Sequence, residues 1–276
     1  VRPSVELHLE NVAYDLAGKQ QWVFIRADNG FNASIMDASP ALFKNRLIIS
    51  VGRELLGLDA ATGKEVWKYD TGRSRATANS PVVGHVGKTA MVIPGSGCAL
   101  DPASGQPVTP ELGISAYCTS PLFMDGMVYV VGEERNGFGW NTAARLEAGA
   151  TGIVVKELWK NRYGGKGKSN FPDGPLGANV AERFFASPAV YEGQLITQNQ
   201  FGVLYVIHPE TGAIIKRTDL AAGAGRRGQE GACAFMSPAV AGGVLFIGKR
   251  EGPVVIFRGK DMKEIEALIV RMIELF

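Results

Sequence analysis

Arginine is the side chain with binding chemistry that recurs in the irregular segments of this 276-residue sequence. The guanidinium group is a planar fork of hydrogen-bond donors that matches a carboxylate or a phosphate. We expect these arginines, with two phenylalanines that follow one of them, to form a surface for an anionic ligand or an acidic protein partner. The candidate residues are Arg26, Arg73, Arg75, Arg162, Arg183, Phe184, Phe185, Arg226 and Arg227.

Both residue types also have a plainer interpretation. The arginines can be solvated loop charges paired with nearby carboxylates such as Asp70 or Glu182, and isolated surface pairs contribute little. Phe184 and Phe185 end the longest irregular stretch, residues 161–186. They either line a binding surface or pack in the core, as aromatic side chains usually do.

Catalytic and metal-binding patterns are weak. Cys98, Cys118 and Cys233 are unclustered, and the three histidines are scattered. A calcium site takes roughly six to eight oxygen ligands, several of them carboxylates, and no such set stands out. We therefore predict no catalytic residue and no metal site, and the sequence leans against an enzyme.

The elements that must position the arginines are set by a repeated turn. Residues 57–67 read GLDAATGKEVW, and the Asp and Gly suit a tight turn between two strands. Related turns lie at residues 14–22, 100–105 and 207–212, and a stretched copy precedes Trp159. We expect each Trp to pack between neighbouring units while its N–H bonds a backbone carbonyl. The structural repeat residues are Asp15, Gly18, Trp22, Asp59, Thr62, Gly63, Trp67, Asp101, Gly105, Trp159, Thr211 and Gly212.

A second marker, Ser-Pro followed by an apolar run, recurs independently of the turn. Its serines are separated by 41, 40, 67 and 50 residues along the chain. Each interval holds about four short strands, which favours a four-stranded propeller blade. The five serines are Ser39, Ser80, Ser120, Ser187 and Ser237.

These units resemble the blades of the pyrroloquinoline-quinone-type (PQQ-like) β-propeller, whose tryptophan-docking repeat is roughly Ala-x-Asp-x-x-Thr-Gly-x-x-x-Trp. Residues 58–67 match it closely and residues 14–22 match it well. The resemblance covers nearly the whole chain and is strongest with exported bacterial members of no assigned function. It implies an all-β propeller of four-stranded antiparallel blades, about six in this chain, which form a ring alone or part of a seven- or eight-bladed ring.

The resemblance also implies a function. It favours a non-catalytic, periplasmic or exported scaffold that uses its loop face to bind a protein partner, a second copy or an anionic ligand. The alternative is a PQQ-dependent quinoprotein dehydrogenase acting on alcohols or sugars, with PQQ and Ca²⁺. Such enzymes stack the quinone against a disulfide of adjacent cysteines, and no adjacent pair occurs in this sequence. We therefore predict no cofactor.

Composition and length complete the expectations. The net charge of +2 gives no field that favours nucleic acid. No apolar run reaches the roughly 20 residues of a membrane span, and no signal peptide is recognisable. We expect a propeller over residues 1–262, with a partial blade at 1–38 and blades starting near 39, 80, 120, 187 and 237. Residues 263–276 form either an amphipathic helix or a closing strand.

Overall fold

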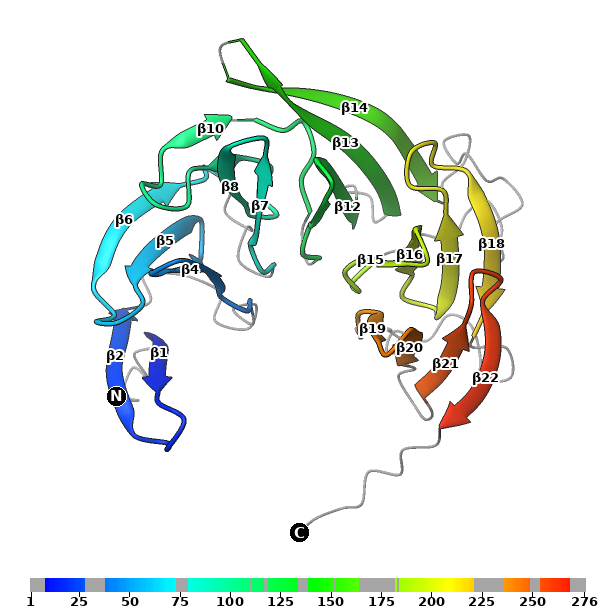
Figure 1. Cartoon of the computed structure of the whole chain (residues 1–276), viewed down its shortest axis with the longest axis horizontal. Coiled ribbons are helices and arrows are strands. Elements are labelled where there is room, and N and C mark those ends of the chain that lie inside the picture. Colours follow the sequence, from blue (N-terminus) through cyan, green and yellow to red (C-terminus); the bar gives the residue numbers. More distant parts are fainter. Residues whose placement is uncertain are drawn as a thin grey trace, which may run out of the picture. The chain divides into compact units, whose positions relative to one another are not determined.

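The regular structure of the described residues consists of β-strands (Figure 1). A computed structural model describes residues 8–27, 38–72, 79–109, 111–116, 119–133, 139–150, 152–163, 182, 184–220, 236–248 and 254–268. No helix occurs among these residues. The all-β fold predicted from the repeats is therefore confirmed.

In the described residues the strands form six sheets, each assembled in chain order. The first sheet has two strands, β1 (His8–Tyr14) and β2 (Gln20–Ala27). The second has β3 (Ala41–Phe43), β4 (Arg46–Val51), β5 (Glu54–Asp59) and β6 (Glu65–Asp70). The third has β7 (Val82–Val86), β8 (Thr89–Ile93), β9 (Ala99–Leu100) and β10 (Pro107–Thr109).

The remaining three sheets have the same four-stranded order. The fourth has β11 (Leu122–Met124), β12 (Met127–Glu133), β13 (Gly139–Gly149) and β14 (Gly152–Tyr163). The fifth has β15 (Ala189–Tyr191), β16 (Gln194–Gln198), β17 (Val203–Ile207) and β18 (Ile214–Asp219). The sixth has β19 (Ala239–Ala241), β20 (Val244–Gly248), β21 (Val254–Arg258) and β22 (Lys263–Leu268).

The Ser-Pro marker builds a hydrogen bond between consecutive sheets. Each Ser lies two residues before the first strand of a four-stranded sheet. The backbone N–H of Ser39 donates to Oγ of Ser80 (2.7 Å), and that of Ser80 donates to Oγ of Ser120 (2.8 Å). Ser187 makes the same bond to Ser237 (2.9 Å). The Pro that follows removes an N–H where the strand has barely begun, so the ladder loses little.

Three tryptophans lock the first, second and fourth sheets to the next one along the chain. Nε1 of Trp67 donates to the carbonyl of Pro102 (3.2 Å), and its ring lies on Gly105 of the same turn. Trp22 bonds Ala60 (3.0 Å) and Trp159 bonds Pro209 (2.8 Å) in the same way. A Cβ built on Gly105 would lie 2.6 Å from the Trp67 ring, so only glycine fits there.

Lysine takes over this docking role at the last of these positions. Lys216 stands four residues past Gly212, where the copies at Gly18 and Gly63 have Trp22 and Trp67. Its Nζ donates to the carbonyls of Asp261 (3.0 Å) and Met262 (3.3 Å) in the turn of the sixth sheet. The ammonium group therefore docks on the next turn, as an indole N–H does elsewhere, but at carbonyls two and three residues further along that turn.

The chain divides into two compact units, Val1–Gly126 with Leu146–Val154, and Met127–Arg145 with Val155–Phe276. In the first unit, the second sheet packs against the first through one buried cluster, on which Phe24 lies: Ile49, Val51, Leu56 and Leu58. A second cluster joins the second and third sheets: Ile48, Leu55, Trp67, Val92, Cys98 and Leu100. In the second unit, the fifth and sixth sheets share a core: Tyr191, Ile196, Leu204, Val206, Leu220, Leu245, Ile247, Val255, Phe257 and Met262. Within each unit, neighbouring sheets thus share an apolar core.

Of the two structures predicted for the C-terminal segment, a helix or a closing strand, its described part forms the strand. Lys263–Leu268 form β22, which pairs antiparallel with β21 from Val254↔Leu268 to Arg258↔Lys263. Residues 269–276 lie outside the described residues.

Candidate functional site

The candidate site is the loop face, which we define by two kinds of connection. One kind joins the second and third strands of a sheet, and the other precedes each Ser-Pro. Both lie at the end of the sheet opposite the Trp-docking turns, because consecutive strands are antiparallel. Within each unit the face therefore collects segments from different sheets at one end of the strands.

Backbone hydrogen bonds tie the two kinds of connection together in three sheets. Thr71, just past β6, donates its N–H to the carbonyl of Arg53 (2.9 Å) in the second sheet. Leu112 donates to Gly97 (2.7 Å) in the third sheet, and Leu220 donates to Gly202 (3.1 Å) in the fifth. The loop face is thus held by the same backbone contact in each of these sheets.

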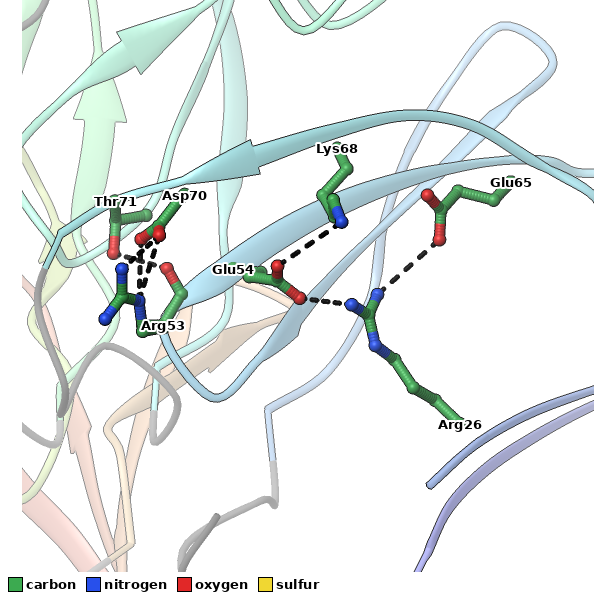
Figure 2. Close-up of polar contacts among 7 residues, drawn as sticks. All are labelled: Arg26, Arg53, Glu54, Glu65, Lys68, Asp70 and Thr71. Atoms are coloured by element: carbon green, nitrogen blue, oxygen red, sulfur yellow. Dashed lines mark hydrogen bonds and ion pairs between the residues drawn. The ribbon is translucent and has the colours of Figure 1, made fainter. Parts of the chain in front are cut away.

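The second sheet carries a network of charges on this face, and Figure 2 shows its members as sticks. Arg53 forms a two-pronged contact with Asp70, with Nε lying 2.9 Å from Oδ1 and 3.0 Å from Oδ2. Arg53 and Asp70 remain about half exposed, at 53% and 46% of their side chains. The hydrogen bond from Arg53 lowers the pKa of the Asp70 carboxyl below its ordinary value, and the Gly72 N–H adds to the effect.

The same network bridges the first and second sheets. Arg26 on β2 contacts Glu54 on β5, and its other terminal nitrogen lies 3.5 Å from Glu65 on β6 (Figure 2). Lys68 reaches the second oxygen of Glu54 at 3.7 Å. Arg26 is 21% exposed. Its charge is therefore engaged by two carboxylates of the neighbouring sheet.

The second unit carries a buried polar cluster on its loop face. Glu182 is 3% exposed, and its Oε2 accepts hydrogen bonds from Oη of Tyr205 (2.6 Å) and Nδ2 of Asn199 (2.7 Å). Oδ1 of Asn199 in turn accepts the backbone N–H groups of Phe201 (3.0 Å) and Val203 (2.9 Å). Glu182 lies shortly before a Ser-Pro, and Asn199 begins the β16–β17 connection. The carboxylate thus fastens one loop of the face to the other.

Aromatic rings surround this carboxylate. The ring of Tyr163 lies 4.9 Å from that of Tyr205 and 5.1 Å, edge-on, from that of Phe184. Nδ2 of Asn141 donates to Oη of Tyr163 (2.8 Å). Burial, and then the charge of Glu182, raise the pKa of Tyr205, while burial raises the pKa of Tyr163. Both phenols therefore stay protonated as hydrogen-bond donors at neutral pH.

Two residues of this cluster, Asn199 and Tyr205, stand where the second sheet has aliphatic side chains. Ala41↔Ile48 in the second sheet corresponds to Ala189↔Ile196 in the fifth, because both pairs open the sheet two residues after Ser-Pro. From this register, the pair Ile49↔Leu56 corresponds to Thr197↔Tyr205. Buried polar groups need hydrogen-bond partners to be tolerated. Tyr205 meets this need through Glu182, whereas Oγ1 of Thr197 is buried without a hydrogen-bond partner among the described residues.

The structure places four of the nine predicted site residues. Arg26 forms the ion pairs described above, and Arg162 is exposed near the end of β14. Phe184 is 2% exposed in the ring cluster, and Phe185 beside it is half-buried. The other five, Arg73, Arg75, Arg183, Arg226 and Arg227, lie outside the described residues.

The sequence interpretation missed the residues that organise the loop face. Arg53, Asn199 and Tyr205 were not singled out, and Glu182 was considered only as an arginine partner. Alignment of the repeats by strand register would have indicated two of them, since Asn199 and Tyr205 are polar where the second sheet has Val51 and Leu56. Among the residues that the structure describes, no group of three or more His, Cys, Asp or Glu side chains is arranged to hold a metal ion.

The four-stranded antiparallel sheets, added one after another and docked through Trp and Ser-Pro, define the class of the protein, which is an all-β propeller. The sequence pattern of the family described as outer membrane protein assembly factor BamB matches residues 10–264, and the chain belongs to this family. No curated protein matches the chain in sequence.

Solved structures support the fold. BamB from Moraxella catarrhalis superposes with a TM-score of 0.59 at 15% identity, over 94% of this chain and 70% of that one. The quinohemoprotein alcohol dehydrogenase of Comamonas testosteroni gives a TM-score of 0.60 at 14% identity, over 85% of this chain but only 43% of the enzyme. A second such dehydrogenase, ADHIIG from Pseudomonas putida HK5, gives 0.56 at 16% identity, over 84% and 42%. At these identities the likeness concerns the fold.

Proposed function

We propose that this chain is a non-catalytic propeller scaffold that binds a protein partner through its loop face, and that it serves the assembly of outer membrane proteins. The family and the fold support this proposal. It implies a periplasmic or exported location. Within the described residues no helix is long and apolar enough to cross a membrane.

The observation that carries the proposal is the repeated bond between the two connections of the loop face. Thr71–Arg53, Leu112–Gly97 and Leu220–Gly202 hold the loops before any partner arrives. A surface that is already ordered loses less conformational entropy on binding, which favours affinity without large buried area. Such a face suits a scaffold that must present several loops at once.

The charges of the second sheet give this face a way to select partners. Arg53 and Asp70 are paired with each other, but both remain accessible at the loop end. Charged groups at an interface steer encounter and exclude wrong partners more than they add affinity. We expect a partner that brings its own carboxylate or cation to this pair.

A charge swap separates recognition from simple structural support. The probe is an unfolded outer membrane β-barrel protein, labelled with a fluorophore and titrated with the purified chain. Arg53→Glu should weaken binding by about tenfold, a change of roughly 1.4 kcal/mol. The double variant Arg53→Glu with Asp70→Arg restores the ion pair with reversed polarity. The double variant should still bind the probe more weakly than the wild type if the partner recognises the sign of these charges.

The matched control is Lys64→Glu, which reverses a charge in the exposed β5–β6 turn at the opposite end of the same sheet. It should bind like the wild type. Equal binding by all variants, or no saturable binding by the wild type, would show that the loop face is not the binding surface for this partner.

A second candidate function is favoured by the likeness to the two alcohol dehydrogenases. Titration with PQQ and Ca²⁺, followed by absorbance and thermal unfolding, tests it. A ligand that binds the folded state raises its stability as the ligand concentration rises above the Kd. Saturable, Ca²⁺-dependent binding of PQQ would favour the dehydrogenase over the scaffold.

A further inference from the structure

The β16–β17 connection of the fifth sheet is a tight turn with an aromatic side chain at its tip. The N–H of Gly202 donates to the carbonyl of Asn199 (3.1 Å), and Gly202 has a φ of +79°. A glycine in this conformation is typical of a three-residue hairpin. Leu220, in the connection before the next Ser-Pro, donates its N–H to the carbonyl of Gly202 (3.1 Å). Phe201, at the tip, is half-buried and therefore partly accessible on the loop face.

A side-chain amide fixes the conformation of this turn. Oδ1 of Asn199 accepts the N–H groups of Phe201 (3.0 Å) and Val203 (2.9 Å), and its Nδ2 donates to Glu182 (2.7 Å). An amide group can turn over and exchange its oxygen for its nitrogen. An ionised carboxylate only accepts hydrogen bonds, so Glu182 keeps the nitrogen on its own side and the oxygen toward the turn. The pair of Glu182 and Asn199 thus holds the backbone of Phe201 in one place.

The sheet itself does not require this pair. In the second sheet the positions of Asn199 and Tyr205 are occupied by Val51 and Leu56, and the same strand pairing forms. Glu182 is 3% exposed. Taking a carboxylate out of water is costly, and aliphatic packing at the same place is often at least as stabilising. A buried carboxylate where aliphatic residues suffice for pairing indicates a requirement of the turn rather than of the sheet.

The third sheet holds its corresponding connection in a similar way but covers it. Oδ1 of Asn79, which precedes β7, accepts the N–H of Gly95 in the β8–β9 connection (2.8 Å). Ala116 donates to the carbonyl of Gly95 (2.7 Å) from the other connection of the same sheet. Residues 94–98 are buried, so a partner does not reach them. The turn of Phe201 is fastened as firmly and keeps part of its aromatic ring accessible.

We propose that Glu182 and Asn199 position the β16–β17 turn for binding, and that Phe201 is the contact residue. This inference rests on the proposed function and adds the chemistry of the partner, which places an apolar side chain on the Phe201 ring. A membrane β-barrel polypeptide carries apolar side chains at alternate residues of its strands. Aromatic residues are enriched among those that dominate binding energy, and a turn that is already ordered loses less entropy on binding.

Phe201→Ala tests the contact. The probe is again a labelled, unfolded outer membrane β-barrel protein titrated with the purified chain. The truncation removes the ring and leaves the backbone hydrogen bonds of the turn in place. It should therefore fold and bind the probe about tenfold more weakly than the wild type. Phe201→Leu keeps an apolar side chain and should recover part of the affinity.

Asn199→Val tests the positioning, because it introduces the residue type that the second sheet has at Val51. Amide hydrogen exchange at Phe201 and Val203 should become faster. The probe should bind about fivefold more weakly, although Phe201 is unchanged. The matched control is Lys216→Met, which removes hydrogen bonds at the docking end of the same sheet. It should bind like the wild type at a temperature where all variants are folded.

The outcomes distinguish this inference from the proposed function. If Phe201→Ala binds like the wild type while Arg53→Glu binds weakly, the loop face binds the partner without this turn. Normal binding by Asn199→Val would show that the buried pair serves the fold alone. An equal loss in Lys216→Met and Asn199→Val would show that affinity follows stability, and the positioning role would be wrong. No saturable binding by the wild type would refute the proposed function, and this inference with it.

Discussion

The anchor around Glu182 yields a prediction whose size follows from the structure. Tyr205 and Glu182 are 2% and 3% exposed, and their oxygens are 2.6 Å apart. Hydrogen bonds to a charged group contribute about 1.5–3 kcal/mol, against roughly 1 kcal/mol between neutral groups. Tyr205→Phe keeps the ring and removes the donor, so we expect it to lower the free energy of unfolding by about 2–3 kcal/mol.

The Glu182→Gln background separates the charge from the packing. The side-chain amide of this variant keeps an oxygen that accepts the same bond, so Tyr205→Phe should then destabilise by only about 1 kcal/mol. The double-mutant cycle should give a coupling energy of about 1–2 kcal/mol. Equilibrium urea unfolding measures all four proteins, and amide exchange at Phe201 and Val203 reports whether Asn199 keeps its place. If Tyr205→Phe has the same effect in both backgrounds, within about 0.5 kcal/mol, the carboxylate is not the anchor.

Three further predictions concern docking and pH. Gly105→Ala should destabilise the fold by more than about 1 kcal/mol, since a Cβ would lie 2.6 Å from the Trp67 ring at a φ of +71°. The control Gly87→Ala has a φ of +58° and nothing within 4 Å of its Cβ, so it should show only the smaller backbone effect in thermal unfolding. Lys216→Met should cost about 1–3 kcal/mol in urea unfolding, because two backbone carbonyls lose a charged donor, and an unchanged midpoint would reject lysine as the substitute for Trp. The pKa of Tyr205 is raised above the ordinary 10.0. Its contribution to the free energy of unfolding is therefore complete below pH 10 and is lost as the pH rises further. The free energy of unfolding should fall less steeply with alkaline pH in Tyr205→Phe than in the wild type, and equal slopes would contradict this.

The fold could be predicted because two short patterns each have one structural cause. The Asp-turn-Gly-x-x-x-Trp pattern needs glycine beneath an indole and a carbonyl for its N–H, as Trp67 shows. The Ser-Pro pattern needs a hydroxyl that accepts from the preceding sheet, as Ser80 shows. Both depend on contacts that a local sequence can encode, and they recur in a constant order.

The candidate site was harder to predict because its contacts join residues that are distant in sequence. Arg26 suggested anion binding by its type, yet it pairs with Glu54, 28 residues away. Phe184 suggested a binding surface by its place after a long irregular stretch, and the fold packs it against Tyr163. No local pattern shows whether a charge or an aromatic ring in a loop has a partner on the next sheet.

Binding of a protein by the loop face can be tested with a single titration. A labelled, unfolded outer membrane β-barrel protein is titrated with the wild-type chain, Arg53→Glu, its charge swap with Asp70→Arg, and Lys64→Glu. We expect saturable binding by the wild type and Lys64→Glu, and about tenfold weaker binding by the two Arg53 variants. Absent binding by the wild type, or identical curves for all four proteins, would contradict it.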